Sequence, residues 1–210
     1  MHNLNEYCTS KCEVILYNGN PNLEKLEQLS QGFGDIWHSS FEQGFKNAFP
    51  EICYQVFVFF WYVNDFENLE ESISWRLNPN HFCIRKSVWE QLGGFDTDYK
   101  NPQLAALDFA FNALRNRGAI TMYAKGLFSD TQNELLPISV KDRYIFYRKN
   151  FKLDHSIFML YRKGIWNWKE LNAFFYARKN YKIRPKQSVL SPRTLNKIEG
   201  NPTVSYIIPT

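Results

Sequence analysis

The chain has 210 residues, of which 44% are hydrophobic and 22% are charged, so it is neither a disordered tail nor a fibrous repeat. Aromatic residues make up 17% of the chain, an excess that predicts flat contact surfaces for ring-stacking ligands, sugars or a membrane interface. No apolar run approaches the roughly 20 residues that span a bilayer. The N-terminus lacks the basic start and apolar core of a signal peptide. We therefore expect a soluble, cytoplasmic chain.

Positive and negative charges lie in different parts of the sequence. Residues 1–140 carry 10 Lys and Arg against 17 Asp and Glu, whereas residues 141–210 carry 15 against 4. Two interpretations remain open: the basic part docks against the acidic body, or it meets an anionic surface such as phospholipid or a diphosphate-linked acceptor. The basic residues lie among large apolar residues and match no nucleic-acid reader motif, so nucleic acid is not an expected partner.

The first part of the chain shows a strand pattern followed by a helix pattern. A short buried strand is predicted over residues 13–17 and a turn over 18–21. Asn22 then caps a helix that ends before Gly32. The aromatic and β-branched run 54–63 predicts a second strand, covered on both faces.

Strand and helix patterns continue to alternate further along the chain, which predicts an α/β layer. The predicted strands are 82–84 and 119–124, and the predicted helices are 86–92 and 102–117. From residue 140 to about 181 the pattern is helical, and a break at Gly164 predicts two helices. Residues 183–203 contain prolines and scattered basic residues and are interpreted as a linker.

Residues 80–96 carry the most specific pattern in the sequence. A small strand is followed by the basic pair Arg85 and Lys86, a short helix and a Gly-Gly-Phe-Asp turn. The two glycines allow a tight helix exit with positive φ, and Asp96 is placed to cap the next segment of the chain. This segment resembles the acceptor-side signature of family-2 glycosyltransferases, which have the nucleotide-diphospho-sugar transferase (GT-A) fold.

Residues 107–118 are similar to the acidic helix of the same family that runs to a glycine before a strand. The resemblance implies that Asp108 is the general base that deprotonates the acceptor hydroxyl in an inverting displacement. Leu107 and Ala110 stand where the family has further acids. A lone Asp at a helix N-terminus also satisfies free backbone amides, so a structural role for Asp108 stays open.

The other candidate substrate-binding residues are aromatic, basic or acidic side chains. They are Trp37, His38, Trp75, Arg76, Arg85 and Asp96. The aromatic members would stack on a sugar, and the arginines would assist the donor phosphates. The family holds those phosphates with a divalent metal, Mn or Mg, on an Asp-x-Asp pair. Here Asn64 and Asp65 follow the predicted strand 54–63, so Asp65 is the one metal-ligand candidate for the full-length protein.

The run 204–210 reads Val-Ser-Tyr-Ile-Ile-Pro-Thr and resembles the first strand of a family-2 glycosyltransferase domain. It would either fold back as an edge strand or open a following transferase domain, and we favour the second. The resemblance then divides the chain into a partial GT-A-like α/β domain (1–139), a basic aromatic helical segment (140–182), a linker (183–203) and that strand.

The resemblance implies the N-terminal domain of a bacterial family-2 glycosyltransferase in surface polysaccharide synthesis. Its partners would be a nucleotide-sugar donor, a glycan or lipid-linked acceptor and the following transferase domain. The alternative is a non-catalytic glycan-binding or assembly domain with a degenerate transferase fold, which the missing second acid and the poor metal pair favour for the isolated chain. A third interpretation is a membrane-docking module, whose basic aromatic helices would contact the inner face of the membrane.

Overall fold

The computed structural model describes residues 4–39, 70–129, 136–185 and 187–190, and within them the chain folds around one mixed sheet of six strands. The strands are β1 (Asn5–Cys8), β2 (Val14–Asn18), β3 (Ile36–His38), β4 (Glu71–Ile73), β5 (Phe82–Arg85) and β6 (Thr121–Ala124). Their order in the sheet is β1-β2-β5-β3-β6-β4. β3 and β6 run parallel, and the other neighbouring strands are antiparallel.

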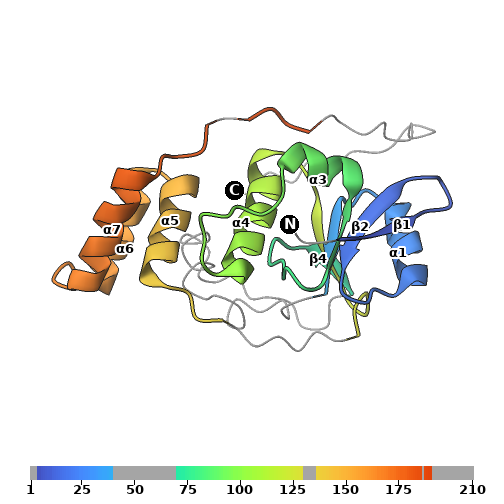
Figure 1. The fold of residues 1–210 in the computed structure, drawn as a ribbon, viewed down its shortest axis with the longest axis horizontal. Helices are drawn as coiled ribbons and strands as arrows, with labels where there is room; N and C mark the ends of the chain where they lie inside the picture. Colours follow the sequence, from blue (N-terminus) through green and yellow to red (C-terminus); the bar gives the residue numbers. More distant parts are fainter. Residues whose placement is uncertain (1–3, 40–69, 130–135, 186, 191–210) are drawn as a thin grey trace, which may run out of the picture.

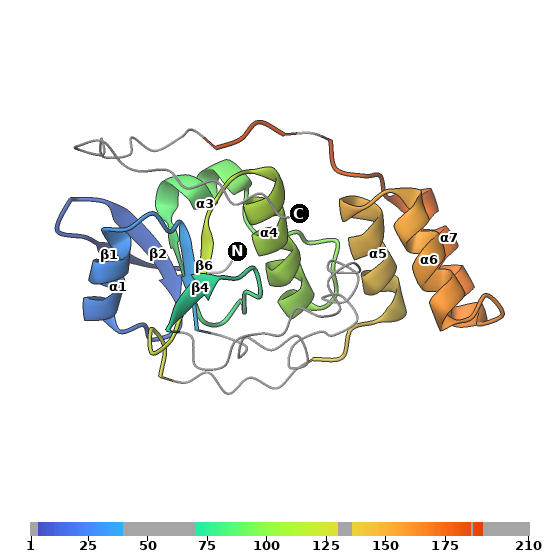
Figure 2. The same cartoon turned by 180° about the vertical axis from the view of Figure 1, so that it is seen from behind.

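Six helices of the described residues cover and extend this sheet. They are α1 (Leu23–Ser30), α3 (Lys86–Leu92), α4 (Pro102–Asn116), α5 (Val140–Asn150), α6 (Leu153–Lys163) and α7 (Trp168–Asn180). α1 lies on one face of the sheet, and α3 and α4 lie on the other (Figure 1). α5 follows beyond α4, and α6 and α7 form the end of the molecule furthest from α1 (Figures 1 and 2).

Side chains alternate between the two faces of the sheet, so neighbouring residues of one strand belong to different cores. Ile15 and Trp37 pack on the α1 face with Leu26 of that helix. Leu16 and Ile36, each next to one of these residues, pack on the opposite face. The second core continues from the sheet through α4 and α5 to α6 and α7, so the C-terminal helical segment shares the core of the layer.

Most of the helices and strands predicted from local sequence patterns are confirmed. β2, β5, β6, α1, α3 and α4 all lie where the sequence predicts them, with small shifts at their ends. Asn22 caps α1 by accepting a hydrogen bond from the amide of Lys25 at 3.0 Å. Gly93 and Gly94 follow α3 with φ of 79° each, a conformation that L side chains rarely adopt. The predicted strand 54–63 lies outside the described residues.

The prediction of two helices after residue 140 is wrong, because the structure has three. The additional break separates α5 from α6 at Phe151, whose backbone is extended (φ −131°, ψ 162°). No glycine or proline marks this break, and the buried Phe151 ring ends α5 against the core instead. Strands β1, β3 and β4 were also not predicted; each has three or four residues, and pairing with a neighbouring strand places it in the sheet.

The first residues of the segment interpreted as a linker lie against the layer. The backbone amide of Leu190 donates to the carbonyl of Arg117 at 2.9 Å, and the Leu190 side chain is buried in the larger core. The amide of Arg184 donates to the carbonyl of Lys149 at 2.9 Å. The chain after α7 is therefore fixed to α5 and to the end of α4. None of the helices described here is long and apolar enough to cross a bilayer.

Candidate functional site

Asp108 lies in the middle of α4 and is fully buried, with 0% of its surface exposed. The N-terminus of α4 is capped by Asn101, which accepts from the amide of Leu104 at 3.0 Å, and Pro102 occupies the first turn. The predicted start of this helix at residue 102 is confirmed. Asp108 lies in its interior, where backbone amides are bonded within the helix, so the role that was left open for a lone Asp at a helix N-terminus does not apply.

The carboxylate of Asp108 is held by two side chains from distant parts of the sequence. Arg184 donates to both oxygens, with Nη1 at 2.9 Å from Oδ1 and Nη2 on Oδ2. Asn150, the last residue of α5, donates from Nδ2 to Oδ1 at 2.6 Å. Arg184 Nη1 also donates to the amide oxygen of Asn150 at 2.7 Å, which closes a ring of three side chains. A bidentate arginine–carboxylate pair is among the strong hydrogen-bonded contacts in proteins.

The same arginine reaches the Gly-Gly-Phe-Asp turn. Arg184 Nη2 lies 3.2 Å from an oxygen of Asp96, and Lys149 donates to that same oxygen at 2.6 Å. Lys149 also donates to Asp98 at 2.5 Å. Asp96 accepts from the amide of Asp98 at 3.0 Å, as expected for a residue that caps the next segment. We call Asp96, Asp98, Asp108, Lys149, Asn150 and Arg184 the Arg184 cluster.

In the Arg184 cluster, burial and neighbouring opposite charges shift the pKa values of the side chains in opposite directions. Burial alone would lower the pKa of Arg184, but hydrogen bonds to Asp108 and its negative charge outweigh that effect and raise it. Burial alone would raise the pKa of Asp96, but hydrogen bonds from Lys149 and the Asp98 amide, together with the charges of Lys149 and Arg184, lower it overall. Burial and the charge of Asp108 raise the pKa of the neighbouring Tyr99 well above its usual value.

These contacts decide what Asp108 can do in this arrangement. A general base must lie within hydrogen-bond reach of the proton that it removes. Both oxygens of Asp108 already accept hydrogen bonds, and no part of the side chain is exposed to a ligand. As folded here, Asp108 joins α4 to α5 and to the segment after α7.

Arg85 and Trp37 lie on the opposite face of the sheet from Asp108. Arg85 is buried and donates to the carbonyls of Gly34 at 2.9 Å and Ser30 at 2.8 Å, and it also pairs with Glu13. Its guanidinium stands 5.0 Å from the centre of the Trp37 ring. Arg85 therefore holds the end of α1 to the sheet, and the layer of the sheet separates it from Asp108.

His38, Trp75 and Arg76 are brought close in a third place, and all three are buried. The Nε2 atom of His38 lies 3.0 Å from the carbonyl oxygen of Ser74, the residue before Trp75. The Trp75 ring packs edge-on against Phe111 of α4 with centroids 5.2 Å apart. The seven predicted residues in the described part thus form three separate sets of contacts. They do not form one open cleft.

A divalent metal of the expected kind needs several free oxygen ligands at one point. Asp96 and Asp98 are neighbours, but the ammonium group of Lys149 already lies between their oxygens. Within the described ranges no three His, Cys, Asp or Glu side chains gather at one point. These residues do not fit a metal that needs several free oxygen ligands. Asp65 lies outside the described residues.

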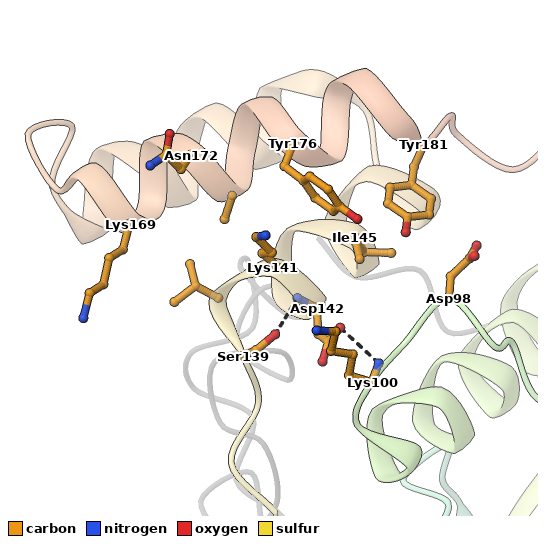
Figure 3. Close-up of a pocket in the computed structure, with 12 residues that line it drawn as sticks. Asp98, Lys100, Ser139, Lys141, Asp142, Ile145, Lys169, Asn172, Tyr176 and Tyr181 are labelled. Carbon is orange, nitrogen blue, oxygen red and sulfur yellow. Dashed lines mark hydrogen bonds between the residues drawn. The ribbon is translucent and has the colours of Figure 1, made fainter.

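A groove of about 410 Å³ lies between α7, the start of α5 and the loop before α4. Figure 3 shows Tyr176 and Tyr181 at one end of the groove and Lys169 and Asn172 further along α7. Asp98 closes the end near Tyr181, which joins the groove to the Arg184 cluster through Lys149. The volume lies within the range that small-ligand sites usually have, roughly 300–1,000 Å³.

The groove offers rings, cations and an amide to a ligand. Lys141 stands over the ring of Tyr176, with Nζ 4.6 Å from its centre. The rings of Tyr176 and Tyr181 are 6.2 Å apart, and burial and hydrogen bonding with Tyr176 raise the pKa of Tyr181 to about 12. Sequence reasoning noted the aromatic and basic character of residues 140–182 but missed the groove, because residues of three separate segments line it.

Comparisons of the chain with protein-family models, curated proteins and solved structures found no match. The family-2 resemblance therefore stands on residues 80–96 and 107–118 of the sequence, together with the run 204–210. The structure itself establishes an α/β layer with a C-terminal helical segment.

Proposed function

We propose that this chain is a glycan-binding or assembly module of a bacterial family-2 glycosyltransferase system, with a degenerate transferase layer that does not itself transfer sugar. The observation that carries the proposal is the state of Asp108, the residue that matches the family's base. It is fully buried, and Arg184 and Asn150 occupy its carboxylate. Transfer from the nucleotide-sugar donor would then belong to another domain or chain.

The relation to glycosyltransferases is supported by the retained Gly-Gly-Phe-Asp turn and the helix after it. Phe95 of that turn packs against Phe82, Trp89 and Phe109, with ring centroids between 5.2 and 5.4 Å apart. Asp96 still orders the turn through the amide of Asp98. The turn is therefore kept as a structural element, while the acidic residues around it bind cations of this same chain.

The groove beside α7 is our candidate for the glycan site. Tyrosine rings provide apolar contact area for the C–H groups of a sugar, and Asn172, Asp98 and the lysines provide hydrogen bonds to hydroxyls. Because Lys100, Lys141 and Lys169 outnumber the acids Asp98 and Asp142 around the groove, an acidic or phosphorylated saccharide would suit it best.

The first experiment tests for transferase chemistry in the chain itself. We would titrate it by calorimetry with UDP-glucose, UDP-N-acetylglucosamine, GDP-mannose and dTDP-rhamnose, with and without Mn²⁺. We expect no metal-dependent binding and no turnover, and Asp108→Asn should not alter that result. Micromolar binding that requires Mn²⁺, or sugar transfer that Asp108→Asn abolishes, would show a catalytic domain and would contradict the proposal.

The second experiment tests the groove. The chain would be applied to an array of neutral, acidic and phosphorylated bacterial oligosaccharides, and any ligand found would be titrated against variants. Tyr176→Ala and Asn172→Ala should each weaken binding by about tenfold, since each removes a contact from the groove. Phe175→Ala is the matched control, because Phe175 is the exposed neighbour of Tyr176 and does not line the groove. Absence of binding, or equal losses in all three variants, would refute a glycan site here.

A further inference from the structure

The turn between α6 and α7 exposes tryptophan side chains from an ordered backbone. The amide of Gly164 donates to the carbonyl of Tyr161 at 3.3 Å, and the amide of Asn167 donates to the carbonyl of Gly164 at 2.9 Å. Asn167 also caps α7 by accepting from the amide of Lys169 at 3.1 Å. Gly164 has a φ of 98°, which suits glycine and fixes the direction of the turn. The turn is therefore built in a defined shape.

Large apolar side chains project from this turn. Trp166 is 91% exposed, Trp168 is 72% exposed and Tyr161 is 74% exposed. Ile165 between them is also exposed. We call these four residues the aromatic tip. The turn between α6 and α7 lies at the end of the molecule furthest from α1 (Figures 1 and 2).

Within residues 161–169, which contain the aromatic tip, every charged side chain is positive. Arg162, Lys163 and Lys169 are exposed and lie within the same nine residues as the tip. The sequence has no acidic residue from 155 to 169. The next acid, Glu170, is buried and pairs with Arg143 at 2.5 Å, so its charge is compensated inside the protein. The tip thus combines interfacial aromatic rings with an excess of surface cations.

We infer that the aromatic tip docks onto an anionic phospholipid surface. Tryptophan and tyrosine favour the membrane–water interface because their rings are apolar and their N–H or O–H groups remain hydrated. Lysine and arginine beside them are attracted to anionic headgroups. This inference is independent of the proposed glycan function.

The test uses sedimentation with sucrose-loaded vesicles of phosphatidylcholine alone and with about 30% phosphatidylglycerol. The chain should bind the anionic vesicles and should bind the neutral ones much more weakly. Trp166→Ser/Trp168→Ser should weaken binding to the anionic vesicles by about tenfold. Phe33→Ser is the matched control, since Phe33 is an exposed ring in the loop between α1 and β3, away from α6 and α7.

Two charge-reversal variants show whether vesicle binding depends on where the cations lie or only on the net charge of the chain. Arg162→Glu/Lys163→Glu should also weaken vesicle binding by about tenfold. Lys11→Glu/Arg115→Glu changes the net charge equally at exposed sites in the β1–β2 turn and the last turn of α4, and it should retain binding.

Several outcomes would overturn the inference. The wild-type chain could fail to sediment with anionic vesicles, or it could bind neutral vesicles equally well. The tryptophan variant could also bind anionic vesicles as well as the wild-type chain does. Light scattering tests for a second copy of the chain on the tip. If the wild-type chain is a dimer that does not bind vesicles, and Trp166→Ser/Trp168→Ser is a monomer, a second copy covers the tip.

Discussion

The buried Arg85 and the partly buried Arg184 stand on opposite faces of the sheet and make different contacts. Arg85, in the central strand β5, donates mainly to neutral carbonyl groups at the end of α1 and in the loop after it. Arg184, in the segment after α7, pairs with the carboxylates of Asp108 and Asp96. Two acids lie beside Arg85: Glu13 is partly exposed, and Asp35 is buried with an oxygen 3.8 Å from Arg85 Nε. Asp35 also accepts a hydrogen bond from the backbone amide of Ile120 at 2.7 Å. Asp108 beside Arg184 is fully buried.

This difference shows how each region depends on its arginine. The α1 face has a hydrophobic core of its own, and beside it Arg85 donates hydrogen bonds to the carbonyls of Ser30 and Gly34. On the α4 face, Arg184 neutralises a charge that the fold has removed from water, and it ties α5 and the segment after α7 to the layer. Removing the partner of a buried charge lowers the free energy of unfolding more than removing a hydrogen-bond donor to neutral groups does.

The largest expected effect is therefore at Arg184. Arg184→Met leaves the Asp108 carboxylate buried without its main cation, and we expect a loss of about 3–5 kcal/mol in the free energy of unfolding. Urea unfolding followed by circular dichroism measures it. Arg184→Met/Asp108→Asn should recover part of the loss, because the uncompensated charge is then gone. A loss below about 1 kcal/mol for the single variant would contradict a buried pair.

A smaller effect is expected at Arg85. Arg85→Met leaves the carbonyls of Ser30 and Gly34 without this donor. Glu13 can regain water, and Asp35 keeps the hydrogen bond from the amide of Ile120, so we expect a loss of about 2–3 kcal/mol in the free energy of unfolding. The opening should be local, and Cys83 reports it. Burial raises the pKa of the Cys83 thiol far above its usual value, so labelling requires an opening of the core.

Mass spectrometry of thiol labelling distinguishes the two faces. Arg85→Met should speed the labelling of Cys83 more than Arg184→Met does, at a denaturant concentration where both variants remain folded. Cys8 and Cys12 are exposed and serve as internal controls for reagent and pH. Equal acceleration in both variants would mean that the two faces open as one unit.

The comparison also shows which parts of this structure can be predicted from the sequence. Asn22, Gly93 and Gly118 mark the ends of helices by local rules, and α1, α3 and α4 are found at those positions. The break at Phe151 carries no such residue, because core packing produces it. Very short strands such as β3 lack a readable alternation and exist because their neighbours pair with them.

The site was harder to predict for the same reason. The resemblance singled out Asp108, but its partner Arg184 lies 76 positions later, in a segment interpreted as a linker from its prolines. Composition describes the average behaviour of a segment and cannot show that one arginine reaches a buried carboxylate. Arg85 looked like a phosphate ligand beside Lys86, yet strand alternation turns it to the α1 face.

The smallest effect concerns Asp96, which is half-buried and shared between Lys149 and Arg184. Its pKa is lowered in the folded chain, so the unfolded chain binds its proton more readily, near the ordinary value of about 3.9. The stability from this group is complete above that value and is lost as the pH falls through the lower, folded pKa.

Wild-type stability should therefore fall in acid more steeply than that of Asp96→Asn, and the two curves should converge at low pH. Glu24→Gln, an exposed site on α1, should keep the wild-type slope. If Asp96→Asn instead kept the full acid slope of the wild-type chain, the lowered pKa of Asp96 would not be the source of the acid dependence, and its pairing with Lys149 and Arg184 would contribute little to stability.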